Sequence, residues 1–348
     1  MLRIRGYYVS WRLIITAAVS FMFISYLSST FDVKIDVKMK PLDPRAAEPD
    51  PETTEEKNTH LKQSLVDASD GLPLDLRFTR NITRMVFNRV GKCGSRSLIH
   101  TIDLLSKKMS YPHVKSKIFT QKKLLEHEQA EFAFEVDSYD PPFIYNRHVN
   151  FVDFARYGVD QPYWINQIRD PLNRTVSFFY YTRFGDGMSV RDTSGRNVDL
   201  TFDDCVLKNH PECNITNTFA IIPYFCGQDP GCYEPTRYAL ETAKQNVLKH
   251  FIFVGVLEEF TTSLLILEQI LPQFFQGAPE AYQQTQEKGL VESYKSVQRK
   301  EPSENVKAIM KERLSLEYEF YYFVKRRFDL IKDQLISDGL IHADDAWQ

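Results

Sequence analysis

The stretch Met85-Val-Phe-Asn-Arg-Val-Gly-Lys-Cys-Gly-Ser-Arg-Ser97 decides the fold of this chain. Residues 83–87 form a short apolar run, which predicts a buried strand. From Ser95 onward, apolar residues recur at helical spacing and predict a helix over 95–109. The polar loop between them therefore lies at a helix N-terminus, where unpaired backbone N–H groups and the helix dipole favour an anion.

The charge around this loop supports an anion site. Residues 80–97 include five basic residues and no acidic one. The loop differs from the ATPase P-loop, which needs an earlier glycine and a Ser or Thr directly after the lysine to hold magnesium. Here Cys93 follows Lys92 and the earlier glycine is missing. The sequence therefore predicts a phosphate-binding loop without a magnesium site.

A second loop of the same kind lies in Ile168-Arg-Asp-Pro-Leu-Asn-Arg-Thr-Val-Ser177. Asp170 is expected to cap a helix whose first residue is Pro171. Arg169 and Ser177 are then candidates for a second phosphate. A single loop of either kind is more often a solvated turn or an ordinary helix start, but the pair favours one nucleotide that carries phosphate at two positions.

The rest of the chain alternates between strand and helix patterns. Further strands are expected at 163–167 and 251–256, and further helices at 171–182, 237–248, 258–270 and 303–335. This alternation predicts an α/β domain with a central parallel sheet, helices on both faces and ligand loops at the carboxyl ends of the strands. With 348 residues, 43% of them hydrophobic, the chain can form one large core, placed here at 78–340.

The N-terminal region reads as a membrane anchor followed by a stem. Residues 13–31 are apolar or small, close to the ~20 residues that span a bilayer. Basic residues before them place 1–12 in the cytosol. The alternative is a cleaved signal peptide, but no small-residue cleavage site follows the apolar run. Residues 32–77 are rich in Pro, Asp, Glu and Lys, which predicts a solvated stem.

Cysteine usage favours an oxidising compartment. Four of the five cysteines form two close pairs, Cys205 with Cys213 and Cys226 with Cys232. Short disulfide loops explain these spacings better than zinc ligation does. Cys93 is either a reactive thiol or, as we favour, a small residue whose backbone N–H faces the phosphate.

The sequence also limits which binding partners and covalent modifications are expected. Sequons begin at Asn81 and Asn214; a third, at Asn173, lies inside the second motif, where a glycan would obstruct folding or binding. The sequence contains no metal-ligand constellation. Its net charge of −3 argues against a nucleic-acid-binding protein. A polyanionic partner would need a local basic groove.

Several motifs in one order resemble the Golgi sulfotransferases, and among them the uronyl 2-O-sulfotransferase family, Pipe-like enzymes included. Besides the loop near Lys92, they are Arg147-His-Val149, Arg183-Phe-Gly-Asp186, Ile222-Pro-Tyr-Phe-Cys-Gly-Gln228, Val254-Gly-Val-Leu-Glu-Glu259 and Tyr318-Glu-Phe-Tyr321. Heparan sulfate 2-O-sulfotransferase is a more distant relative of this pattern. The resemblance implies a single-pass type II protein of the Golgi membrane with a luminal catalytic domain and, as in the heparan branch, a homotrimer.

The resemblance also implies the donor and its contacts. The donor would be 3′-phosphoadenosine 5′-phosphosulfate, with no metal. Its 5′-phosphosulfate would meet Lys92, Cys93, Gly94, Ser95, Arg96 and Ser97. Its 3′-phosphate would meet Arg169 and Ser177. A loop that closes over the nucleotide would contribute Tyr282, Ser296 and Arg299.

Catalysis and acceptor binding follow from the same resemblance. His148 would act as general base, and Lys92 would stabilise the leaving group. The resemblance and guanidinium chemistry nominate Arg89, Arg147 and Arg183 for the acceptor. The heparan branch carries His-Gly-His where this chain has Asn146-Arg147-His148, which favours a dermatan- or chondroitin-type acceptor.

Three alternatives remain open at this point. The first is a heparan sulfate 2-O-sulfotransferase. The second is a kinase-like or nucleotide-hydrolysing enzyme, which the residue after Lys92 and the lack of a magnesium carboxylate disfavour. The third is an inactive luminal protein that binds glycans.

Overall fold

The computed structural model describes residues 2–4, 7–9, 79–118, 121–188 and 197–347. The chain divides into two units between Gln63 and Ser64. In the first unit, β1 (Leu2–Ile4) and β2 (Tyr7–Val9) form an antiparallel pair. The expected anchor at 13–31 and stem at 32–77 lie outside the described residues. Among the helices that are described, none has the length and apolar character needed to cross a membrane.

The second unit is built on a five-stranded sheet of order β4-β5-β3-β6-β7, in which all neighbouring strands are parallel. Its strands are β3 (Arg84–Asn88), β4 (His113–Lys115), β5 (Phe143–Arg147), β6 (Tyr163–Ile168) and β7 (Phe251–Val256). The predicted parallel sheet is therefore confirmed. The three expected strands are present within one residue at each end, whereas β4 and β5 were not expected.

Helices surround the sheet. They are α4 (Ser95–Met109), α5 (Glu126–Asp137), α6 (Pro171–Phe184), α7 (Phe202–Leu207), α8 (Ile215–Thr218), α9 (Ile222–Cys226), α10 (Arg237–His250), α11 (Phe260–Ile270), α12 (Pro272–Phe275), α13 (Ala278–Glu287), α14 (Leu290–Ser293), α15 (Glu304–Arg313) and α16 (Ser315–Ser337). Short 3-10 turns occur at Phe154–Tyr157, Pro211–Cys213, Pro230–Tyr233, Leu257–Glu259 and Ala343–Trp347.

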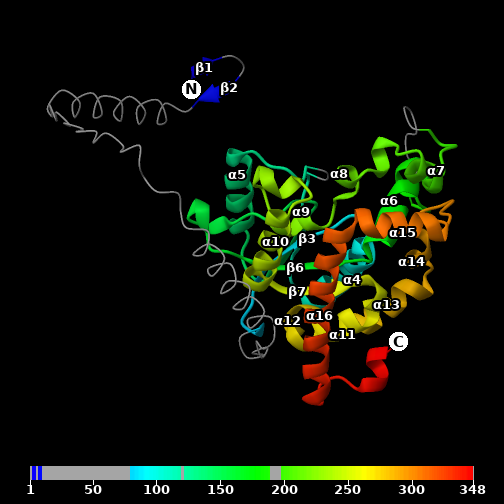
Figure 1. Ribbon diagram of the computed structural model, residues 1–348. Helices are drawn as coiled ribbons and strands as arrows, with labels where there is room; N and C mark the ends of the chain where they lie inside the picture. The colour runs from blue at the N-terminus through cyan, green and yellow to red at the C-terminus, as the bar shows by residue number, and fades with distance from the viewer. Residues whose placement is uncertain (1, 5–6, 10–78, 119–120, 189–196, 348) are drawn as a thin grey trace, which may run out of the picture. The chain divides into compact units, whose positions relative to one another are not determined.

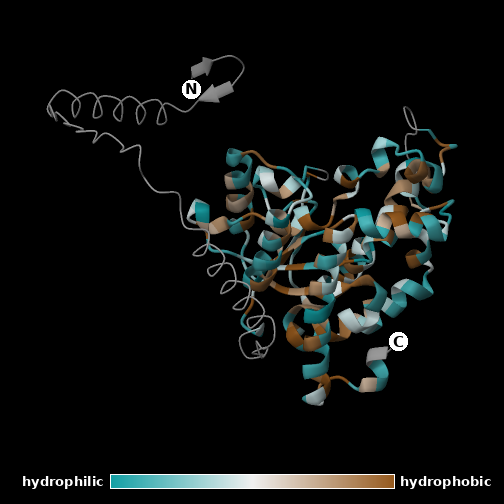
Figure 2. Cartoon of the chain, in the orientation of Figure 1, coloured by the Kyte–Doolittle hydropathy of each residue, from teal (hydrophilic) through white to brown (hydrophobic). Residues whose placement is uncertain are grey.

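The helices form two layers. Right-handed crossovers place α4 on one face of the sheet and α5 and α10 on the other. Contacts agree, because α4 packs with α12 and α13, and α10 packs with α9 and α16 (Figure 1). The strands between these layers are strongly hydrophobic (Figure 2), and Trp164 and Phe87 are fully buried there. A second, smaller cluster of buried residues lies between α6, α7 and α15.

The helix predicted over 95–109 has the predicted bounds, and those predicted over 171–182 and 237–248 extend to Phe184 and His250. The other two predicted helices differ more. The helix expected over 303–335 is two helices, because Leu314 leaves the helical conformation with φ −93° and ψ 16°. The helix expected from residue 258 begins at Phe260, after a 3-10 turn.

Both predicted disulfides form. Cys205 bonds to Cys213 and Cys226 bonds to Cys232. The first closes a loop beside α7, and the second closes the loop that follows α9. The pairing inferred from the sequence is therefore confirmed.

A buried carboxylate ties α16 to the start of α9. Glu317 is 2% exposed. Its Oε1 accepts hydrogen bonds from the backbone N–H groups of Ala220 (2.9 Å), Ile221 (2.9 Å) and Ile222 (3.2 Å). Burial raises the pKa of this carboxyl to about 7, against the opposing effect of these N–H donors.

Removing this carboxylate should destabilise the fold. Glu317→Ala leaves several buried N–H groups without an acceptor, and we expect it to lower the free energy of unfolding by about 2–5 kcal/mol in urea denaturation. Glu319 is the matched control, since it lies on the same helix but pairs with Arg237 and Lys244 near the surface. Glu319→Ala should cost less than about 1 kcal/mol. Equal losses for the two variants would contradict the role of Glu317.

Candidate active site

The loop between β3 and α4 has a backbone that few residues can adopt. Lys92 has φ 67° and Gly94 has φ 74°, both in the left-handed region. A Cβ on Gly94 would collide with Leu257 Cδ1 and lie 3.2 Å from Gln167 Nε2, so the crowding and the left-handed φ together favour glycine. The first turn of α4 contains no acidic residue. The loop therefore presents the N-terminus of α4 in the arrangement that suits a phosphate.

Two cations of this loop lie against Tyr181 of α6. Lys92 Nζ is 4.1 Å from the centre of the Tyr181 ring. The Arg96 guanidinium donates to the Tyr181 hydroxyl (3.2 Å) and pairs with Asp186 (2.7 Å), whose side chain is 1% exposed. Tyr181 and Asp186 therefore fix the position of the first turn of α4 relative to α6.

His148 follows directly after β5 and lies beside the same loop. Its Nδ1 is 2.7 Å from the backbone carbonyl oxygen of Arg89. A carbonyl only accepts, so Nδ1 carries the proton and Nε2 carries the lone pair. Burial, and then the charge of Arg89, lowers the pKa of His148 to about 3, with smaller contributions from Lys122 and Arg96. The imidazole is therefore neutral at physiological pH and able to accept a proton at Nε2.

The second loop brings together residues that are more than 100 positions apart. Arg169 follows β6, and burial and the charge of Arg299 lower its pKa. Arg299 donates to Asn173 Oδ1 (2.8 Å). Ser296 Oγ lies 3.1 Å from Ser177 Oγ and donates to the Ser177 carbonyl (2.9 Å). Two arginines that repel each other, next to two hydroxyl groups, form an arrangement that suits a phosphate.

The two loops are joined beneath the surface. Arg174 of α6 is 4% exposed, and its Nε donates to the Gly91 carbonyl (3.3 Å). Cys93 is fully buried within the electrostatic reach of both Arg174 and Arg169, and desolvation raises the pKa of its thiol to about 12. The thiol is therefore protonated, which agrees with a small structural residue. The predicted cap is also present, because Asp170 accepts from the Asn173 N–H (2.7 Å).

Comparison with known proteins identifies the family. A model described as "Sulfotransferase family" matches residues 77–324. This chain belongs to the sulfotransferase family. Human uronyl 2-sulfotransferase is 41% identical over 257 residues, which cover 72% of this chain and 63% of that protein. The chain thus spans slightly less than two thirds of the length of this relative.

Two further relatives lie in the heparan branch. Heparan sulfate 2-O-sulfotransferase 1 of Gallus gallus is 32% identical over 263 residues, which cover 73% of each chain. The heparin sulfate O-sulfotransferase of Drosophila melanogaster is 30% identical over 268 residues, which cover 74% of this chain and 76% of that protein. The five-stranded sheet and both loops described above lie within the residues that match the family, 77–324.

Two arginines nominated for the acceptor point into the protein. Arg147 is 4% exposed, and its guanidinium lies 5.2 Å from the centre of the Phe132 ring. Arg183 is 0% exposed; it stacks on Phe179 at 3.6 Å and pairs with Glu212 at 3.0 Å. Buried and engaged in this way, neither charge faces an acceptor, so we correct both assignments to structural roles. Arg89 remains half-buried beside His148.

Tyr282 also lies in the core of this chain. It is 8% exposed on α13, and its ring contacts Phe260 edge-on at 4.5 Å. The hydrogen bonds of Ser296 and Arg299 go to Ser177, Asn173 and Glu301. Sequence reasoning missed Arg174 and Tyr181, although both lie in the helix that the second motif predicted.

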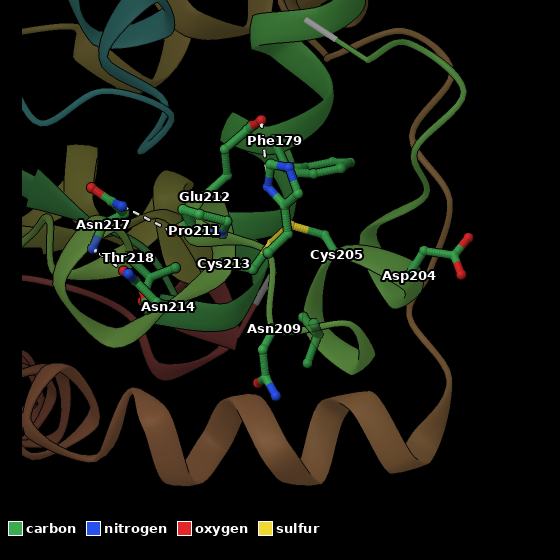
Figure 3. Close-up of a disulfide and its surroundings, with 12 residues drawn as sticks. Phe179, Asp204, Cys205, Asn209, Pro211, Glu212, Cys213, Asn214, Asn217 and Thr218 are labelled. Atoms are coloured by element: carbon green, nitrogen blue, oxygen red, sulfur yellow. Dashed lines mark hydrogen bonds and ion pairs between the residues drawn. A yellow bond between two sulfur atoms is a disulfide. The ribbon is translucent and has the colours of Figure 1, made fainter.

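The three sequons differ in accessibility. Asn81 and Asn214 are exposed. Asn214 caps α8 beside the Cys205–Cys213 disulfide, where the Asn217 side chain donates to the Pro211 carbonyl at 2.8 Å (Figure 3). Asn173 is half-buried and bound to Arg299. A glycan at Asn173 would displace that contact.

The conformation of Gly94 gives a test of the phosphate loop. Gly94→Ala should lower the free energy of unfolding by about 2 kcal/mol or more, because left-handed strain adds to the collision with Leu257. Gly158 has a similar φ of 71°, but a Cβ added there would meet no atom within 4 Å. Gly158→Ala should therefore cost only about 1 kcal/mol. Urea denaturation compares the two, and an equal cost would contradict the close contact with Leu257.

The neutral state of His148 gives a second test. Its lowered pKa, about 3, predicts that the imidazole of the unliganded protein stays uncharged from pH 8 down to pH 5. NMR of ring-labelled histidine follows the titration, and His148→Asn identifies the signal. A midpoint near 6.5 for His148 would contradict the prediction.

Proposed function

We propose that this chain is a Golgi uronyl 2-O-sulfotransferase. It would move the sulfuryl group of 3′-phosphoadenosine 5′-phosphosulfate to the 2-hydroxyl of a uronic acid in a dermatan- or chondroitin-type glycan. One observation carries the proposal. Nδ1 of His148 is hydrogen-bonded to the Arg89 carbonyl of the loop that contains Lys92, and Arg169 lies within electrostatic reach of Cys93 in that loop.

The residues present suit the two charged ends of such a donor. The α4 N-terminus, Lys92 and the hydroxyls of Ser95 and Ser97 would bind the 5′-phosphosulfate. Arg169, Ser177, Ser296 and Arg299 would bind the 3′-phosphate. The Tyr181 ring, 4.1 Å from Lys92 Nζ, holds the ammonium group of Lys92 in place. The carbonyl of Gly91, fixed by Arg174, keeps the loop in the orientation that binding requires.

Catalysis would use His148 and Lys92. Nε2 of His148 takes the proton of the acceptor 2-hydroxyl as that oxygen bonds to sulfur. The bond between sulfur and the bridging 5′-phosphate oxygen breaks at the same centre. Lys92 stabilises the negative charge that develops on that oxygen. The products are a sulfate ester and adenosine 3′,5′-bisphosphate, and the proton remains on His148 until solvent removes it.

The choice of acceptor rests on similarity and on one substitution. The human uronyl relative is 41% identical to this chain, and the Gallus gallus heparan relative is 32% identical. Asn146 replaces the first histidine of the heparan pattern; it is 3% exposed, and its amide is hydrogen-bonded to His113 (2.7 Å). These observations favour a uronyl enzyme, with a heparan sulfate 2-O-sulfotransferase as the second candidate.

The compartment is proposed on the sequence and the disulfides together. Two short disulfides favour an oxidising lumen. Residues 13–31 would anchor a single-pass type II protein in the Golgi membrane, with 32–77 as stem and 78–340 in the lumen. The exposed Asn81 and Asn214 would carry glycans there. A homotrimer is proposed by resemblance to the heparan branch.

A transfer assay tests this proposal. The purified full chain would receive a radiolabelled sulfate donor and, in parallel, dermatan sulfate, chondroitin and heparan sulfate. We expect label at the 2-position of uronic acid, mostly in dermatan or chondroitin. Greater incorporation into heparan sulfate would favour the second candidate. No incorporation with intact binding of adenosine 3′,5′-bisphosphate would favour a glycan-binding protein without activity.

Two variants separate the base from the donor site. His148→Ala should lower kcat by about 10²–10⁴-fold, because it removes the proton acceptor. Its affinity for adenosine 3′,5′-bisphosphate, measured by calorimetry, should stay within about twofold of wild type. Lys92→Ala should damage both turnover and donor binding. The exposed His342→Ala is the control; a near-wild-type rate for His148→Ala would rule out the assigned base.

A further inference from the structure

One cation near His148 has no assigned role. Lys122 follows β4 in a connection that returns to the carboxyl edge of the sheet. Its charge is among those that lower the pKa of His148, so its amine lies within electrostatic reach of the imidazole. The side chain is exposed, and its Nζ lies 5.4 Å from the centre of the Tyr224 ring. The sequence motifs gave no reason to single it out.

The backbone of Lys122 is held firmly. Its carbonyl oxygen accepts from the Asn150 N–H (3.1 Å) and from Gln228 Nε2 (3.1 Å). Gln228 also donates to the Asn150 carbonyl (3.0 Å) and accepts from the Leu124 N–H (2.9 Å). Gln228 lies within the loop closed by the Cys226–Cys232 disulfide. These hydrogen bonds join three chain segments, which contain Lys122, Asn150 and Gln228. Lys122 therefore keeps a fixed place relative to His148.

The platform beneath Lys122 is aromatic and connects to the sheet. Tyr224 is 2% exposed, and its carbonyl accepts from Asn88 Nδ2 (2.8 Å) at the end of β3. The next lysine, Lys123, lies 3.5 Å from the centre of the Tyr233 ring. These cation–π contacts leave the ammonium groups free to bind an anion on their outer side, since a ring neutralises no formal charge.

The charges around His148 are of one sign. Arg89, Lys122 and Arg96 all lower its pKa, and no carboxylate is among the main contributors. Arg96 is paired with Asp186. Within the described part of the chain, no carboxylate oxygen lies within 4 Å of Lys122 Nζ. Partial desolvation and the charges of Arg174 and Lys123 lower its pKa to about 8. A nearby anion would relieve this repulsion.

We propose that Lys122 binds an oxyanion of the acceptor beside the hydroxyl that faces His148. This inference rests on the proposed function and makes Lys122 a residue that determines acceptor specificity. Lys122 and Arg89 lie on two different segments that flank the imidazole, and each supplies a cation. This pair of cations would favour a sugar with negative charge close to the reacting position. The oxyanion is either the carboxylate of the uronic acid or a sulfate of the neighbouring sugar.

The test measures glycan binding by the full chain at fixed ionic strength. Surface plasmon resonance would compare wild type, Lys122→Gln and Lys122→Arg on immobilised dermatan sulfate. We expect Lys122→Gln to weaken binding about tenfold, and Lys122→Arg to retain most of the affinity because its charge persists. Lys249→Gln removes the same charge from an exposed position on α10 and should bind like wild type.

Modified polymers identify the oxyanion. Two modified polymers are compared, carboxyl-reduced dermatan and desulfated dermatan, and one of them lacks the group that Lys122 contacts. On that polymer, the dissociation constant of Lys122→Gln divided by that of wild type should fall to about 1. A ratio near 1 on the unmodified polymer would overturn the inference. A tenfold ratio that persists on both modified polymers would also overturn it.

Kinetics distinguish this inference from the proposed function. In the transfer assay, Lys122→Gln should raise the KM for acceptor about tenfold, while donor affinity stays within about twofold of wild type. If wild type transfers sulfate and the variant keeps its KM, only the role of Lys122 fails. If wild type transfers nothing, the proposed function fails, and the binding experiment still decides the role of Lys122.

Discussion

The parallel pairing of β3 with both β5 and β6 is the constraint on which the site depends. Asn88 lies opposite Arg147, so the loop containing Lys92 and the loop containing His148 leave the sheet together. A buried amide network fixes this register. Asn166 of β6 donates to the carbonyl (2.6 Å) and the side chain (2.7 Å) of Asn88, and Asn88 donates to the Tyr224 carbonyl. A shift of one residue would leave these buried amides without partners, which is costly.

The same geometry concentrates positive charge. Burial lowers the pKa of Arg89 to about 10, and burial and Arg299 lower that of Arg169. The fold thus holds cations close together at some cost in stability, as functional sites often do. Burial, together with the charges of Arg89, Lys122 and Arg96, also keeps His148 neutral. Binding of an anionic donor would relieve the repulsion, so the unliganded site is organised for its ligand before the ligand arrives.

Sequence patterns predicted the parts of the site that local chemistry determines. The loop near Lys92 and the Asp170 cap depend on neighbours in the chain, and both are present. Strand β5 escaped notice because all five of its residues are buried, so it has no polar alternation, and it ends in Asn146 and Arg147. The sequence nominates Arg147 and Arg183 for the acceptor because it shows their charge. Only the folded chain shows that Arg147 lies against the Phe132 ring and that Arg183 pairs with Glu212.

Helix α6 links the site to Arg183, the buried arginine to which we gave a structural role. Near its start, Arg174 donates to the Gly91 carbonyl of the first loop, and Ser177 contacts Ser296. Tyr181 holds Lys92 one turn further along. At the far end, Arg183 anchors the helix to Glu212, inside the loop closed by the Cys205–Cys213 disulfide. Because one rigid helix contacts both proposed phosphate sites, a disulfide remote from the chemistry helps to set the distance between them.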